Sequence, residues 1–243
     1  MRSKLFVPGA RPELFDKAMA GAADVLSFDL EDSVREAGKA GARAQVAGFL
    51  SRPGVADSGR LLIVRSNGTD TPHFAADVAA VALQSVWLLN LPKVETVTQV
   101  HAAVASLERA EAANGVTRPI GLLLNIETPC GLRMAPALAA AHPRVAGLQL
   151  GLGDLFAPHG IARTAANVHA TLFALRMAAA EAGVFACDGA FPDVGDDDGF
   201  RAEARLAHTL GFIGKSCIHP RQVGLANEVF GASDAALDEA CRI

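Results

Sequence analysis

Short apolar runs alternate with longer helix-like segments along almost the whole chain. The runs contain few polar residues and fall at positions 4–7, 24–28, 61–64, 85–89, 120–124, 146–150, 184–187 and 212–215. They are apolar on both faces and do not alternate, which is typical of parallel strands covered on both sides. The pattern therefore predicts eight buried parallel strands.

The segments between these runs predict helices at 12–22, 39–50, 71–83, 96–114, 131–141, 162–182, 198–210 and 220–230. Asp198 is a candidate cap for its helix, and Gly183 and Gly211 follow predicted helix ends. Eight strand-then-helix units in order predict a closed (β/α)8 TIM barrel, a single domain over residues 1–243. A doubly wound open sheet is the alternative, but it often carries a glycine-rich phosphate loop after the first strand, and this sequence has none there.

Composition narrows the class of protein. The 243 residues fit the roughly 250 of one such barrel, and 51% hydrophobic with 20% charged residues indicates a compact globular chain. A net charge of −4 without a basic stretch argues against nucleic-acid binding. The four scattered cysteines predict free thiols, and without a secretory or membrane-spanning apolar run we expect a cytoplasmic protein.

An ionisable residue follows every predicted strand. In chain order these are Arg11; Asp29, Glu31 and Asp32; Arg65; Lys93; Glu127; Asp154; Asp188; and His219. Active sites of such barrels lie at the carboxyl ends of the strands, so we expect all of these side chains on one rim. Carboxylates gathered with cations indicate a metal and an anionic substrate, and oxygen ligands favour Mg²⁺ or Mn²⁺ over zinc.

Each of these residues also has a structural interpretation. Glu127 and Asp154 are interpreted as metal ligands, although the first could pair with a base and the second could cap a turn. Arg65 is interpreted as a substrate-binding residue and not as a purely structural ion-pair partner. Glu31 and Asp32 either organise water around the metal or orient the neighbouring cations, and the sequence leaves both open.

Two further residues have catalytic alternatives that the sequence disfavours. Lys93 could be a Schiff-base nucleophile, but a lysine needs desolvation or a cationic neighbour for that role, and its surroundings here are anionic. His219, directly before Pro220, is interpreted as a structural hydrogen-bond partner more readily than as a general base.

The motifs themselves resemble a known family. They are LFVPGARPE at 5–13, FDLEDSV at 28–34, VRSN at 64–67, LPKVE at 91–95, IET at 126–128, GLGDL at 151–155 and GFIGKSCIHP at 211–220. In this order, over residues 3 to about 233, the chain resembles the citrate lyase β-subunit-like branch of the HpcH/HpaI aldolase superfamily.

The resemblance implies a TIM barrel that assembles as a homotrimer or a multiple of it, such as a hexamer. It implies that Glu127 and Asp154 hold Mg²⁺, and that Arg65 contacts the substrate carboxylate or the thioester enolate. Arg11 would lie near the same anion, and Gly153 would contact the substrate beside Asp154. The rim would accept CoA or the CoA-like arm of an acyl carrier protein.

The implied activity is that of a Mg²⁺-dependent carbon–carbon lyase. It would cleave or condense a β-hydroxy acyl-CoA thioester such as citramalyl-, malyl- or citryl-CoA, giving acyl-CoA and a 2-oxo acid, with Asp32 as the candidate acceptor of the hydroxyl proton. The alternatives are a class II aldolase acting on free 2-oxo acids and a subunit active only within a larger carrier-protein complex. Many relatives continue into a lid helix that carries an acid/base aspartate, and we expect this chain, ending at Ile243, to lack that extension.

Overall fold

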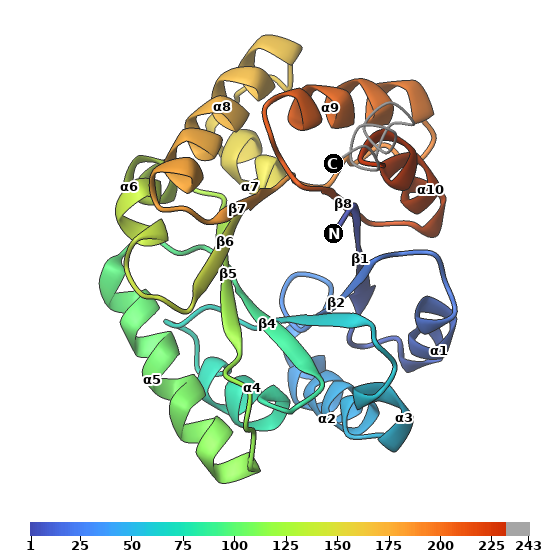
Figure 1. Ribbon diagram of the computed structural model, residues 1–243, viewed down its shortest axis with the longest axis vertical. Helices are drawn as coiled ribbons and strands as arrows, with labels where there is room; N and C mark the ends of the chain where they lie inside the picture. The colour runs from blue at the N-terminus through green and yellow to red at the C-terminus, as the bar shows by residue number, and fades with distance from the viewer. Residues whose placement is uncertain (232–243) are drawn as a thin grey trace, which may run out of the picture.

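The computed structural model describes residues 1–231, and these form eight parallel strands arranged as a barrel inside a ring of helices (Figure 1). The strands are β1 (Ser3–Pro8), β2 (Val25–Asp29), β3 (Leu61–Arg65), β4 (Val86–Leu91), β5 (Gly121–Ile126), β6 (Val145–Leu150), β7 (Phe185–Cys187) and β8 (Lys215–Cys217). Their order in the sheet is β7-β6-β5-β4-β3-β2-β1-β8. The predicted (β/α)8 barrel is confirmed, while residues 232–243 of the expected domain lie outside the described residues.

Backbone hydrogen bonds close the barrel between β7 and β8. The Asp188 N–H donates to the Gly214 carbonyl at 2.8 Å, and the Ser216 N–H donates to the Asp188 carbonyl at 3.0 Å. The prediction of a strand at 212–215 was wrong in its position, since β8 covers Lys215–Cys217. Hydrophobicity misplaced this strand because Lys215 and Ser216 are polar yet fully buried.

Helices cover the outer face of the strands (Figure 1). They are η1 (Pro12–Leu14), α1 (Phe15–Met19), η2 (Glu36–Gly38), α2 (Lys39–Leu50), α3 (Pro53–Ala56), α4 (Phe74–Val81), α5 (Val97–Asn114), α6 (Pro129–Ala139), α7 (Leu152–Phe156), η3 (Ala157–His159), α8 (Ala165–Glu181), α9 (Asp197–Thr209) and α10 (Pro220–Val229). The predicted cap at Asp198 was wrong. Asp196 caps α9 instead, because its side chain accepts a hydrogen bond from the Gly199 N–H at 2.8 Å.

Local sequence signals explain where the longest helix begins and ends. Thr96 and Gln99 form a reciprocal capping box at the start of α5, which satisfies two backbone donors that the helix cannot satisfy itself. The helix ends at Gly115, whose φ of 68° is the left-handed conformation that glycine adopts at low cost. Gly183 and Gly211, expected after helix ends, also have positive φ values of 68° and 85°.

The barrel interior changes from apolar to polar along its axis. Val25, Ile63, Leu88 and Leu123 fill one level of it, and burying each side chain contributes roughly 1.5–3 kcal/mol. Towards the carboxyl ends of the strands, buried polar side chains take over: Ser27, Asp29, Asn90, Asn125 and Gln149. The fold therefore directs polar groups towards the rim where the sequence predicts the site. Within residues 1–231, none of the helices combines the length and apolarity needed to cross a lipid bilayer.

Candidate active site at the carboxyl ends of the strands

Arg65 is fixed by a carboxylate on the neighbouring strand. The parallel register places Asp29 of β2 directly opposite Arg65 of β3. Arg65 Nε lies 2.7 Å from Asp29 Oδ1, and Nη2 lies 2.8 Å from Oδ2, which is a bidentate ion pair. Burial alone would raise the pKa of Asp29, but the hydrogen bonds and charge of Arg65 outweigh it and lower that pKa to about 2. Asp29 is therefore an ionised anchor.

Other contacts orient the same guanidinium. Arg65 Nη1 lies 2.9 Å from Glu31 Oε2 and 3.3 Å from Asp32 Oδ2. The guanidinium carbon also lies 4.9 Å from the centre of the Phe6 ring, within the range of a cation–π contact. These contacts hold the guanidinium at the rim in one orientation.

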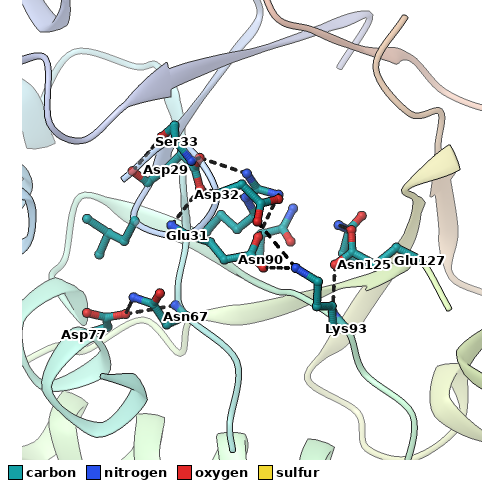
Figure 2. Close-up of polar contacts among 12 residues, drawn as sticks. Asp29, Glu31, Asp32, Ser33, Asn67, Asp77, Asn90, Lys93, Asn125 and Glu127 are labelled. Atoms are coloured by element: carbon teal, nitrogen blue, oxygen red, sulfur yellow. Dashed lines mark hydrogen bonds and ion pairs between the residues drawn. The ribbon is translucent and has the colours of Figure 1, made fainter. Parts of the chain in front are cut away.

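Lys93 joins this network from the segment after β4. Its Nζ lies 2.5 Å from Glu31 Oε1 and 3.5 Å from Asp32 Oδ1 (Figure 2). It also lies 3.9 Å from Asp154 Oδ2. Burial would lower the pKa of Lys93, but the hydrogen bond and charge of Glu31 outweigh it and raise that pKa above the ordinary value. The lysine is a charged ion-pair partner, which argues against the Schiff-base alternative.

The backbone of Lys93 positions the buried acid Glu127. Lys93 has a φ of 51°, a left-handed conformation that is uncommon for residues other than glycine. In this conformation its N–H donates to Glu127 Oε1 at 2.9 Å. The Asn125 side-chain amide donates to Glu127 Oε2 at 2.5 Å, and Asn125 in turn accepts from Gln149 at 2.9 Å. Glu127 is thus held on both oxygens.

Gly151 allows the chain to pass closely beside Glu127. A Cβ atom at Gly151 would lie 2.6 Å from Glu127 Cβ and 2.6 Å from its Oε2, so a side chain there would displace the carboxylate. Burial raises the pKa of Glu127 to about 8, and the charges of Glu31 and Asp154 act in the same direction. The protein therefore holds this carboxylate in a place where its negative charge is poorly compensated.

Asp154 completes the group from the first turn of α7. Its side chain is 49% exposed, and it lines a hollow of about 230 Å³ together with Glu127, Arg65 and Gly153. Two cations, Arg65 and Lys93, form ion pairs with Asp29, Glu31, Asp32 and Asp154, and Glu127 lies beside them as a fifth carboxylate.

This excess of negative charge fits a hard divalent cation. Within residues 1–231 no group of three His, Cys, Asp or Glu side chains is arranged as a complete metal cage. A pair of carboxylates is nevertheless the usual protein contribution to a Mg²⁺ site, because Mg²⁺ keeps several waters and takes other ligands from its substrate.

Comparison with known proteins identifies the family. Residues 2–220 match the family model described as HpcH/HpaI aldolase/citrate lyase. The chain is 38% identical to the L-malyl-CoA/beta-methylmalyl-CoA lyase of Cereibacter sphaeroides, over 100% of this chain and 82% of that protein. It is 34% identical to the citrate lyase subunit beta of Leuconostoc mesenteroides, over 98% of this chain and 80% of that protein. The chain belongs to the HpcH/HpaI aldolase/citrate lyase family.

Solved structures of the family have the same fold. The citrate lyase beta subunit of M. tuberculosis, complexed with oxaloacetate and magnesium, superposes with a TM-score of 0.78 at 32% identity, covering 95% of this chain and 97% of that one. The CitE protein of the same organism, in complex with magnesium, acetoacetate and coenzyme A, gives a TM-score of 0.79 at 31% identity, covering 100% of this chain and 86% of that one.

The structure brings together most of the residues that resemblance to this family singled out. Asp32, Arg65, Glu127 and Asp154 are linked through the contacts of Lys93 and Arg65, and Gly153 lines the same hollow. Arg11 is not part of this group. Its side chain is 58% exposed and pairs with Glu13, its near neighbour in the sequence.

One of the expected rim residues lies elsewhere. Asp188 is fully buried and pairs with Lys215 at 2.5 Å, so the expectation that it faces the rim was wrong. The reason is the alternation of side chains along a strand, since Cys187 occupies the inward position and Asp188 points outwards to the helix layer. His219 caps α10 by accepting a hydrogen bond from the Arg221 N–H at 3.2 Å, which agrees with its structural interpretation.

The sequence analysis did not identify several residues of this site. Asn125 and Gln149 orient Glu127, and polar residues inside otherwise apolar strands were the available signal. Phe6 and Arg163 also line the hollow. Nothing in the pattern marked Arg163, because it follows no strand and lies in the loop between η3 and α8.

A second, apolar cleft adjoins the first. It measures about 430 Å³ and lies among β1, α1 and the start of α10, with Lys17 in its lining. Phe6 and Ile218 contribute to the lining of both spaces. An apolar cleft therefore lies beside the charged hollow.

Proposed function

We propose that the protein is a Mg²⁺-dependent carbon–carbon lyase that cleaves or condenses a β-hydroxy acyl-CoA thioester, giving acyl-CoA and a 2-oxo acid. The observation that carries this proposal is one hollow lined by two carboxylates, Glu127 and Asp154, and by the fixed guanidinium of Arg65. A metal held beside a cation suits an oxo acid, whose carboxylate and carbonyl oxygens are adjacent. The activities in the names of the relatives support the same reaction.

Glu127 and Asp154 would hold the Mg²⁺ ion. When bound, Mg²⁺ supplies a Lewis acid that polarises the carbonyl oxygen of the oxo acid. Asn125 and the Lys93 N–H keep the carboxylate of Glu127 in place. These contacts fix the ligand before the substrate arrives, which lowers the reorganisation needed during the reaction.

Arg65 would stabilise the negative charge that develops on the thioester. Cleavage moves the electron pair of the carbon–carbon bond into an enolate, whose oxygen needs a hydrogen-bond donor until the enolate carbon takes up a proton to give acyl-CoA. The ion pair with Asp29 holds the guanidinium in position, and Nη2 keeps one N–H beyond its bond to that residue. In comparable oxyanion sites such a donor contributes roughly 3–4 kcal/mol to transition-state stabilisation.

Asp32 would accept the proton of the substrate hydroxyl as the carbonyl forms. Its side chain is 52% exposed, so a bound substrate can reach it. It lies 3.3 Å from Arg65 Nη1 and 3.5 Å from Lys93 Nζ, so it borders the same group of charged side chains. The same carboxyl group would return the proton when the reaction runs towards condensation.

The apolar cleft would accept the arm of the thioester. It shares Phe6 and Ile218 with the lining of the charged hollow, and Lys17 also lines it. Arg11, which lies outside the charged hollow, would bind the anionic part of CoA together with Lys17. The proposal also includes assembly as a homotrimer or a multiple of it, a possible acyl carrier protein as partner, and a cytoplasmic location.

The test is a cleavage screen of malyl-, citramalyl- and citryl-CoA with and without Mg²⁺, on the wild-type chain and on Glu127→Ala and Asp154→Ala. We expect metal-dependent release of acyl-CoA by the wild type and none by either variant. Glu228→Ala, which removes a carboxylate that is 53% exposed and paired with Arg201 on the helix surface, is the matched control. Unchanged Mg²⁺ affinity in both site variants, measured by calorimetry, would overturn the assignment.

A carrier-dependent subunit is the second candidate. The relative named citrate lyase subunit beta supports it, because that name describes one part of a larger enzyme. Isolated protein that binds Mg²⁺ and oxo acid but cleaves only a carrier-bound thioester would favour this alternative over the free-CoA reaction. Turnover of free 2-oxo acids without any thioester would instead favour a class II aldolase.

A further inference from the structure

Arg163 is a second guanidinium in the hollow that holds Arg65, Glu127 and Asp154. It belongs to the loop between η3 and α8, and its side chain is 22% exposed. It forms no ion pair with the carboxylates around Lys93, and the reaction proposed above gives it no role. A cation held at a substrate pocket without a catalytic task requires an explanation.

The contacts of Arg163 leave one side of its guanidinium available. Nε lies 3.0 Å from Glu203 Oε2 and Nη2 lies 2.6 Å from Glu203 Oε1, which is a bidentate pair. Nη2 also donates to the Ala190 carbonyl at 2.9 Å. Within the described part of the chain, all its hydrogen bonds and ion pairs use Nε and Nη2. The N–H groups of Nη1 remain for a ligand on a guanidinium that is already oriented.

Glu203 forms an ion pair with a second cation besides Arg163. Its Oε1 also lies 2.8 Å from Lys215 Nζ, which is fully buried. Lys215 also pairs with Asp188 at 2.5 Å, so two cations and two carboxylates form one network. This network holds the guanidinium of Arg163 in place, and its Nη1 takes no part in it.

We propose that Arg163 determines substrate specificity by binding a second carboxylate, so that the enzyme prefers thioesters that release a dicarboxylic 2-oxo acid. This inference rests on the proposed lyase function and adds the substrate class. A hollow of about 230 Å³ accommodates an oxo acid of that size. The other donor side chains of the lining already have partners: Arg65 pairs with Asp29, Asn125 donates to Glu127 and Gln149 donates to Asn125.

The discriminating pair of substrates is citryl-CoA and malyl-CoA. Both release acetyl-CoA, and they differ only in the oxo acid, which is oxaloacetate in the first case and glyoxylate in the second. We expect the wild type to prefer citryl-CoA in kcat/KM. In Arg163→Met the kcat/KM for citryl-CoA should fall roughly 10- to 100-fold, the range for one hydrogen-bonded charge, while that for malyl-CoA changes little. Arg163→Lys should retain part of the preference.

A purely structural role for Arg163 would give a different result. Loss of the Glu203 pair alone would lower the activity on both thioesters equally, or lower only the unfolding temperature, and either outcome overturns the proposal. A wild type that prefers malyl-CoA also overturns it. Arg221→Met is the matched control, because Arg221 is 55% exposed and paired with Asp197, outside the hollow.

Binding measurements separate this inference from the proposed function. Calorimetry of the Mg²⁺-loaded protein with oxaloacetate and with glyoxylate should show tighter binding of oxaloacetate by the wild type and no preference by Arg163→Met. If Arg163→Met does not fold, Arg163→Lys serves in its place, because it keeps the positive charge but lacks the planar guanidinium. A lysine variant whose preference for oxaloacetate in binding and for citryl-CoA in turnover equals that of the wild type would overturn a role for the guanidinium. Failure of the wild type to cleave either thioester would count against the lyase, whereas cleavage with an unchanged preference in Arg163→Met would count against Arg163 alone.

Discussion

At the scale of single residues, Gly151 determines how closely two strand ends approach beside Glu127, one of the two carboxylates proposed to bind Mg²⁺. In Gly151→Ala the new Cβ would lie 2.6 Å from both Cβ and Oε2 of Glu127, so that side chain must move. We expect Mg²⁺ affinity to fall about tenfold or more, the lower end of the effect seen when a ligand loses its orientation.

Calorimetry with Mg²⁺ checks this prediction, and Gly48→Ala is the control. Gly48 lies within α2, and a Cβ there would meet no atom within 4 Å. The control should keep the wild-type affinity and gain slightly in stability, since alanine favours a helix over glycine. Equal Mg²⁺ affinity in Gly151→Ala and the wild type would show that Glu127 is not held by this contact.

Lys4 is a residue whose burial has a measurable energetic consequence. Its side chain is fully buried on β1, and Nζ has no hydrogen-bond partner among the described residues, although it lies 3.9 Å from the centre of the Phe6 ring. Burial lowers the pKa of Lys4 from 10.5 to about 7, and the nearby charge of Arg65 acts in the same direction. Replacement of buried ionic groups by apolar ones can stabilise by about 1–4 kcal/mol, so Lys4→Met should raise the free energy of unfolding at neutral pH.

The stabilisation by Lys4→Met should depend on pH. Between pH 7 and 10.5 the unfolded chain holds a proton on Lys4 that the folded chain has lost, so stability of the wild type rises with pH in this window. The advantage of the variant should therefore be largest below pH 7 and shrink by about 1.4 kcal/mol per pH unit above it. Urea unfolding from pH 6 to 10 measures this difference. Lys17→Met, an exposed lysine, should show no such trend, and a pH-independent gap for Lys4→Met would contradict the argument.

At the scale of secondary-structure elements, the hydrophobic periodicity predicted the helices and strands whose positions depend on burial of apolar side chains. The predicted helix 39–50 coincides with α2, and the predicted helix 96–114 differs from α5 by one residue. The short helices α3 and α7 were not predicted, because segments of four or five residues hold too few positions for a periodic pattern. β8 was misplaced because a buried lysine and serine look like surface residues in the sequence.

The sequence predicted those site residues that directly follow the carboxyl end of a strand. The rule that barrel chemistry lies after each strand brought Asp32, Arg65 and Asp154 to one rim correctly. It failed at Asp188, because side chains alternate along a strand and this one points away from the barrel interior to pair with Lys215. It could not find Arg163, because only the folded loop places that residue beside the hollow.

At the scale of the whole molecule, the charged rim links metal binding to the stability of the barrel. A cation that binds only the folded chain stabilises it by about 2.7 kcal/mol at 100 times its Kd. For a chain of this size each kcal/mol raises the unfolding temperature by roughly 2–4 °C, so saturating Mg²⁺ should raise it by roughly 5–10 °C.

Asp154→Asn separates the two contributions of this carboxylate. Asp154 is 49% exposed, and its single ion pair among the described residues is with Lys93 at 3.9 Å, so its neutralisation should leave metal-free stability within about 0.5 kcal/mol of the wild type. It should also remove most of the Mg²⁺ response, because one of the two proposed protein ligands loses its charge. Thermal unfolding with and without Mg²⁺ measures both quantities. Asp57→Asn, an exposed acid next to α3, should keep the full response, and an equal Mg²⁺ shift in Asp154→Asn would place the ion elsewhere.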